Sequence, residues 1–236
     1  MVGGEPVAPL LGVLDVELLS VPAGHGATLA SSPMSVTPAE QPLVWYVTYG
    51  SNMAADRLTT YLAGGTPTGG RRANPGARDA TPPRRSEPVD LPGALYFAGE
   101  SPQWGGGVAF YDHDATDRGP TAARAYLVTA AQFADVAAQE MYRVPADGDP
   151  VEQVLLDGFD GRHEVGPGRY ETLLEVGRLD GAPLLVFTSP HGIDAVPHTR
   201  PAERYAALLA AGLRESRGWD ESAVAAYVAR VTGAPG

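Results

Sequence analysis

The sequence predicts an α+β fold in which a curved or barrel-like mixed β-sheet is surrounded by helices. Runs of β-branched and aromatic residues alternate irregularly with helical patterns, which fits neither a βαβ array nor a repeat. The chain has 236 residues, of which 44% are hydrophobic, and this is ample for a sizeable core. All aromatic residues (3 Trp, 10 Tyr and 5 Phe) follow residue 42.

The composition changes at residue 42, where we place a boundary between an extension (1–42) and a folded domain (43–236). Residues 1–42 contain no aromatic residue and no Arg, and they are rich in Pro, Gly, Ser and Ala. Such a segment buries too little apolar surface to offset the entropy of ordering, so we expect it to be mobile. Its apolar stretch 10–19 carries two acidic residues and follows no basic residue, unlike a signal peptide, which favours a cytoplasmic protein.

The domain is expected to begin with a strand, a tight turn and a helix. Residues 43–49 are β-branched and aromatic, as in a buried strand. A helix is expected over 53–62, capped by Ser51 or Asn52 and stopped by Gly64-Gly65. A long loop rich in Gly, Pro and Arg is expected over residues 64–93.

The later elements follow from strand patterns, capping signals and helical spacing. Thr129 and Gln132 form a capping box that opens a helix ending near Met141, and Asp180-Gly181 marks a hairpin. Residues 142–168 are turn-rich and carry no clear pattern. Strands are expected at 94–99, 107–111, 123–129, 170–176 and 183–188, and helices at 201–216 and 222–231.

The composition excludes several kinds of chemistry. The chain has no Cys and no Lys, which removes thiol nucleophiles, thiolate metal sites, Schiff-base lysines and Walker-type phosphate loops. Its five His residues lack metal-ligand spacing, so we expect neither a metal nor a cofactor. A net charge of −11 argues against nucleic acid or an anionic membrane as a partner.

The turn from Tyr49 to Met53 is the first candidate site. Gly50 allows a sharp turn and a close approach of ligand to backbone, and the N–H groups of Ser51 to Ala54 are expected to be orphan donors at a helix start. The alternative is a plain connector between strand and helix. Ser51 lacks the flanking residues and the nearby His base of a serine nucleophile.

Glu140 is the second candidate. It shares the apolar stripe of its helix with Phe133 and Val136, whereas Asp135 and Gln139 are expected on the opposite, water-facing side. A carboxylate on a core face is costly unless it is paired or functional. Two alternatives stay open: Glu140 bends back to solvent, or it pairs with an arginine.

The turn Tyr49-Gly50-Ser51-Asn52-Met53 resembles the Y-G-S-N-L/M signature of the γ-glutamylcyclotransferase-like family. In that family the loop binds the γ-glutamyl or 5-oxoproline group through backbone amides. The resemblance also places Gln139-Glu140 on the family's Gln-Glu pair, which makes Glu140 the catalytic residue, and it extends over about residues 45–219.

Further motifs agree with this resemblance. Trp104-Gly105-Gly106 resembles the W-x-G-G strand entry, and Tyr205, on a helix whose apolar stripe could equally hold a core tyrosine, matches a pocket tyrosine. Tyr170 takes the place of a second pocket tyrosine. The chain departs from the pattern at Met141, Ala202 and Leu185, which leaves the substrate open.

The resemblance implies cyclisation of an L-γ-glutamyl group to 5-oxoproline with release of an amine or amino acid, by a monomer or homodimer. Glu140 would act as acid and base, and Tyr49 to Met53, Tyr170 and Tyr205 would bind the small-molecule substrate. The stretch 76–107 is also like that of actinobacterial members often labelled histone deacetylase, but the metal set of that chemistry is not visible in the sequence. The alternatives are a non-catalytic binding module on the same fold and an amidohydrolase that uses water.

Overall fold

The computed structural model describes residues 41–233, so the extension expected over residues 1–42 lies almost wholly outside the described part. The strands are β1 (Leu43–Thr48), β2 (Arg85–Leu91), β3 (Ala94–Ala98), β4 (Val108–Asp112), β5 (Thr121–Thr129), β6 (Arg162–Glu164), β7 (Thr172–Leu179) and β8 (Ala182–Thr188). The helices are α1 (Ala55–Leu62), α2 (Ala130–Glu140), α3 (Pro150–Asp157), α4 (Glu203–Arg217) and α5 (Glu221–Thr232).

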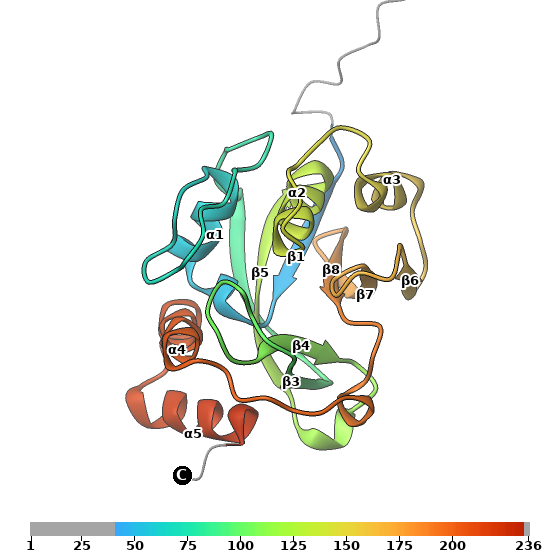
Figure 1. Cartoon of the computed structure of the whole chain (residues 1–236). Coiled ribbons are helices and arrows are strands. Elements are labelled where there is room, and N and C mark those ends of the chain that lie inside the picture. Colours follow the sequence, from blue (N-terminus) through green and yellow to red (C-terminus); the bar gives the residue numbers. More distant parts are fainter. Residues whose placement is uncertain (1–40, 234–236) are drawn as a thin grey trace, which may run out of the picture. The chain divides into compact units, whose positions relative to one another are not determined.

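A six-stranded mixed sheet with helices packed against it forms the centre of the fold, which confirms the predicted α+β class (Figure 1). The strand order is β2-β5-β1-β8-β7-β6, with β1 antiparallel to β5 and parallel to β8. The order has two ends, at β2 and β6, so hydrogen bonds between strands do not close the sheet into a barrel. Strands β3 and β4 pair separately as a hairpin.

Both faces of the central sheet are covered. Along β1, Val44 and Tyr46 point into one core with α1 and α2, whereas Trp45 and Val47 point into a second core with α4 and α5. Side chains alternate across a strand, so a central strand buried on both faces reads as a continuous apolar run. This explains why the sequence marks β1 so clearly.

The structure corrects three local expectations. The loop expected over 64–93 contains β2, and the unassigned stretch 142–168 contains α3 and β6. Neither Ser51 nor Asn52 caps α1: the N-cap position is Ala54, whose side chain makes no capping hydrogen bond. Glu215 of α4 performs this task from a distance in sequence, because its Oε2 accepts the N–H of Ala55 at 3.1 Å. A cap supplied by a distant element leaves no local signal in the sequence.

The segment between β8 and α4 carries the chain past the β3-β4 hairpin (orange, Figure 1). Isolated bridges join Ala98 to His198 and Gly106 to Pro201 along this path. The segment thereby delivers the start of α4, with Tyr205 in its first turn, to the end of β1. Among residues 41–233 no helix is both long and apolar enough to cross a membrane.

Candidate active site

A cavity of about 360 Å³ lies where β1 ends, a size that suits a small-molecule ligand. Its wall is built from segments far apart in sequence: the end of β1 and the turn after it, α1, β4, the end of α2, and α4. The predicted residues Tyr49, Gly50, Ser51, Asn52, Glu140, Tyr170 and Tyr205 all line it. The structure thus brings these seven residues to one place.

Met53 is the predicted residue that the structure places elsewhere. Its side chain is fully buried in the second core and does not line the cavity. Its carbonyl oxygen accepts hydrogen bonds from Arg124 and from the Tyr126 hydroxyl, both at 3.0 Å. Met53 therefore fixes the end of the turn and does not face a ligand.

The backbone of the turn has fewer free donors than the sequence suggests. The N–H of Ser51 donates to the Tyr205 hydroxyl at 3.1 Å, and those of Met53 and Ala54 close short turns on Gly50 and Ser51. Within residues 41–233 the N–H of Asn52 has no acceptor. The expected group of orphan amides from Ser51 to Ala54 is therefore reduced to the one at Asn52.

The side chain of Asn52 holds Glu140 in place. Its Nδ2 donates to Glu140 Oε1 and to the Tyr46 hydroxyl, each at 2.9 Å. Glu140 is the last residue of α2, is partly buried, and is the only carboxylate among the described residues that line the cavity. One of its oxygens is fixed by Asn52, and its carboxylate is presented to the cavity.

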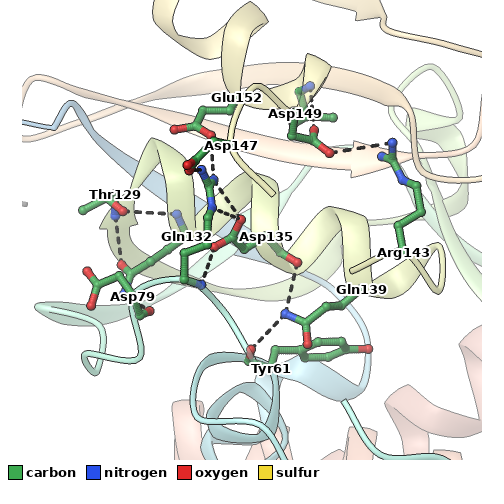
Figure 2. Close-up of polar contacts among 12 residues, drawn as sticks. Tyr61, Asp79, Thr129, Gln132, Asp135, Gln139, Arg143, Asp147, Asp149 and Glu152 are labelled. Atoms are coloured by element: carbon green, nitrogen blue, oxygen red, sulfur yellow. Dashed lines mark hydrogen bonds and ion pairs between the residues drawn. The ribbon is translucent and has the colours of Figure 1, made fainter. Parts of the chain in front are cut away.

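The expectation that Asp135 and Gln139 face water is wrong. Both are buried, and with Gln132 and Arg78 they form what we call the α2 network (Figure 2). Asp135 accepts the N–H and the Nε–H of Arg78 at 2.8 and 2.9 Å. Gln139 accepts the N–H of Gly76 and donates to the carbonyl of Tyr61. The helical wheel failed here because the loop before β2 and α3 cover this face with polar partners.

Burial and the charge of Glu140 raise the pKa of four nearby tyrosines. The pKa of Tyr46, Tyr61, Tyr170 and Tyr205 is raised, first by burial and further by the nearby carboxylate, and for Tyr205 it reaches about 12. These hydroxyls therefore keep their protons at neutral pH and act as hydrogen-bond donors.

The hydroxyls of two of the predicted tyrosines donate to backbone carbonyls. Tyr49 donates to the carbonyl of Phe187 at 3.0 Å, and Tyr170 donates to that of Ala109 at 2.8 Å. These two shape the wall with their rings. The Tyr205 hydroxyl accepts from Ser51 and keeps its own proton for another partner.

The charged residues of the cavity wall are mainly basic. Arg57, Arg72, Arg143 and Arg169 line the cavity together with Glu140. Arg72 and Arg169 lie over the ring of Tyr142, at 4.7 and 5.2 Å from its centroid. A basic cavity in a chain of net charge −11 favours an anionic ligand.

Comparisons with known proteins give a partial match. No family profile matches the sequence. A protein of Arabidopsis thaliana named histone deacetylase 5 is 29% identical in an alignment of 205 residues, which covers 81% of this chain. The chain spans only 31% of the length of that relative.

Two solved structures are similar to this chain at 13% sequence identity. One is an uncharacterised human protein, with a TM-score of 0.45 over 79% of this chain and 86% of that one. The other is a gamma-glutamyl cyclotransferase, with a TM-score of 0.43 over 74% of this chain and 80% of that one.

Among residues 41–233, one group of side chains has the spacing of a metal site. Potential ligand atoms of Asp112, His113 and Asp114 lie within 4.8 Å of one another, outside the cavity wall. Asp112 already accepts the N–H groups of Asp114 and Ile193, at 3.0 and 2.8 Å. These bonds show that the cluster stabilises the turn after β4.

The sequence reasoning missed Arg57 and Tyr61, which face the cavity from α1. They lie four residues apart, so they share one face of the helix. A helical wheel applied to residues 55–62 identifies this pair. The sequence does not distinguish a buried arginine from an exposed one.

Proposed function

We propose that this chain is a γ-glutamylcyclotransferase-like enzyme, which cyclises an L-γ-glutamyl group to 5-oxoproline and releases an amine or amino acid. The observation that carries the proposal is the bond from Asn52 to Glu140 across the cavity. It joins the two sequence motifs of the resemblance, which lie 88 residues apart, into one site. The basic cavity wall supports an anionic substrate of this kind.

Glu140 would move the proton. The α-amine of the substrate is largely protonated near neutral pH, and its lone pair becomes available only when a base removes a proton. The nitrogen then attacks the γ-carbonyl carbon, and the C–N bond to the leaving group breaks. Glu140 returns this proton to the departing nitrogen, and the second proton that the attacking nitrogen loses on forming the lactam passes to the same nitrogen, which leaves as an ammonium while the carboxylate is regenerated.

Two donors would stabilise the negative oxygen that forms on the γ-carbonyl. The free N–H of Asn52 and the hydroxyl proton of Tyr205 are both at the cavity wall beside the turn. Such fixed donors act where charge develops, and they need no rearrangement during the reaction. Closure of a five-membered ring has a high effective molarity, so a proton carrier and two donors suffice without a metal.

A panel of γ-glutamyl compounds tests the proposal and separates it from its alternatives. Incubation of the full chain with γ-glutamyl amino acids, γ-glutamyl amines and glutathione should release 5-oxoproline from at least one of them, with or without EDTA. Release of glutamate alone identifies an amidohydrolase. Absence of any product, together with binding of a panel member, identifies a binding module. Loss of activity with EDTA and its recovery with zinc contradicts the metal-free reaction.

A further inference from the structure

Arg57 is a buried cation without a buried anion to pair with. Its exposed fraction is 4%, and no carboxylate among residues 41–233 forms a salt bridge with it. Its Nε has no hydrogen-bond partner within the described part of the chain. A buried charge is expensive unless it is paired, so this arrangement calls for a partner that the protein itself does not supply.

The contacts of Arg57 orient it and leave donors free. Its Nη1 donates to Thr60 at 2.8 Å, and its Nη2 donates to the Tyr61 hydroxyl. The guanidinium also stacks 4.0 Å from the ring centroid of Tyr61 and 5.5 Å from that of Trp104. Two of its five N–H groups are thus used, and Arg57 is a residue of the cavity wall.

Tyr61 connects Arg57 to Glu140. Its hydroxyl accepts from Arg57, and the charge of the Glu140 carboxylate raises the pKa of the same hydroxyl, after burial and the opposing effect of Arg57. Arg57, Tyr61 and Glu140 all line the same cavity. An amino acid carries its ammonium and carboxylate on a single carbon, so a cavity wall that holds both a carboxylate and a guanidinium offers a partner for each group.

We propose that Arg57 binds the α-carboxylate of the γ-glutamyl group and makes this carboxylate a requirement for the substrate. The inference rests on the proposed cyclisation and adds a specificity-determining residue to it. The fork of Arg57 matches a carboxylate in two parallel hydrogen bonds. With the carboxylate on Arg57, the α-amine of the same carbon faces Glu140, which removes its proton.

A structural role alone is a poor explanation for Arg57. Cation–π contacts with two rings offset only part of the cost of desolvating a guanidinium, and an uncharged long side chain fills the same volume without that cost. We therefore expect Arg57→Met to be as stable as the wild type or more stable in the absence of ligand. An arginine that lowers stability at this position therefore has a role in binding.

Two matched ligand pairs test the inference. 5-Oxoproline and 2-pyrrolidinone differ only in the carboxylate, and so do γ-L-glutamyl-p-nitroanilide and 4-aminobutyryl-p-nitroanilide. Calorimetric titration of the full chain should show a preference for 5-oxoproline of about 10- to 100-fold, the range for a hydrogen bond to a charged group. The value of kcat/KM should show a preference of the same order for the γ-glutamyl anilide.

Arg57→Met should abolish both preferences, and Arg57→Lys should restore part of them. Arg118→Met is the control: it removes an exposed arginine that does not line the cavity, and it should leave the ratio for each pair unchanged. Equal binding of the two lactams by the wild type overturns the inference even if no variant folds. A preference that survives in Arg57→Met also overturns it.

The failure of the inference and that of the proposed function differ in outcome. Formation of 5-oxoproline by the wild type, with a carboxylate preference independent of Arg57, refutes only the role of Arg57. A carboxylate preference that depends on Arg57, without turnover of any γ-glutamyl compound, refutes only the cyclisation. No binding of 5-oxoproline and no turnover refutes both.

Discussion

Two groups of polar side chains meet at α2, and they differ in how completely their hydrogen bonds are satisfied. In the α2 network, both oxygens of Asp135 accept from Arg78, and the side chains of Gln132 and Gln139 have partners at both ends. At the cavity, the Nε of Arg57 and the N–H of Asn52 have no acceptor within residues 41–233. The helix thus carries a closed network on one face and an open one at its end.

The difference separates polar groups that support the fold from groups that can bind a ligand. A buried polar network with every group satisfied rigidifies the structure, and it gains nothing from a ligand. An open one costs free energy until something binds, because unpaired buried donors have lost their water. Here Gln139 belongs to the closed network and Glu140 to the open one, so adjacent residues serve different purposes.

Replacing one carboxylate in each group should produce opposite results. Glu140→Gln keeps the acceptor for Asn52 and removes the group that takes a proton, so kcat should fall by about 10²- to 10⁴-fold with an unchanged or higher melting temperature. Glu140→Asp should also be severely impaired, because a shorter side chain misplaces the carboxylate. Steady-state kinetics and thermal unfolding measure the two effects.

Asp135→Asn is the counterpart in the closed network. The amide points donors at Arg78, so the free energy of unfolding should fall by about 1–3 kcal/mol, while kcat of the folded protein changes little. A Glu140→Gln variant with wild-type turnover removes Glu140 as the base. A Glu140→Gln variant that unfolds places Glu140 in the supporting network instead.

Arg78→Met should be the most destabilising change in the α2 network. It leaves Asp135 buried without its cation, which typically costs about 3–5 kcal/mol near neutral pH. Arg118→Met, which breaks the exposed pair with Asp194, is the control and should cost about 1 kcal/mol or less. Chemical denaturation of both variants gives the comparison.

The cost of Arg78→Met should shrink on acidification. Burial raises the pKa of Asp135, and Arg78 opposes this, so removing Arg78 raises the pKa further. A carboxyl whose pKa is higher in the folded than in the unfolded state stabilises the fold as pH falls through the folded pKa. The variant should therefore approach the wild type in stability between neutral pH and about pH 4. A gap that widens in this range contradicts the account of Asp135.

Gly50→Ala should have the smallest of these effects, and Tyr205 should determine it. A Cβ at Gly50 would lie 2.4 Å from the Tyr205 hydroxyl, whereas its next contacts are at 3.6 Å. Forced repacking of this kind costs about 1–3 kcal/mol. Tyr205→Phe removes the clashing oxygen, so Gly50→Ala should cost little in that background. Equal costs in both backgrounds would show that the close approach of Tyr205 is not the reason for the glycine.

Much of the fold could be predicted from the sequence, because local patterns determine it. β1 and the capping box of α2 lie where predicted, as does the hairpin turn, with φ of 50° at Asp180 and 82° at Gly181. β2 was missed because its exposed, charged sequence lacks the apolar pattern of a strand. The start of α1 was misread because its cap comes from Glu215 on α4.

The site could be predicted only in part, because its chemistry depends on pairing between distant residues. The motifs identified Asn52 and Glu140 separately, and the fold supplies the bond between them. The wheel for α2 set Glu140 apart from Asp135 and Gln139, but it could not show that Arg78 would cover Asp135 and make it the more buried carboxylate. Arg57 went unnoticed since a buried arginine and an exposed one look alike in a sequence.

Reaction in oxygen-18 water tests the cyclisation most directly. The attacking group is the substrate's own amine, so the ring carbonyl of 5-oxoproline keeps the original γ-carbonyl oxygen, and mass spectrometry should find no label in the product. The Glu140→Gln variant should give the same unlabelled product at a greatly reduced rate. Glutamate carrying one labelled oxygen, formed by the wild type in place of the ring, would show that water is the nucleophile and would contradict the account.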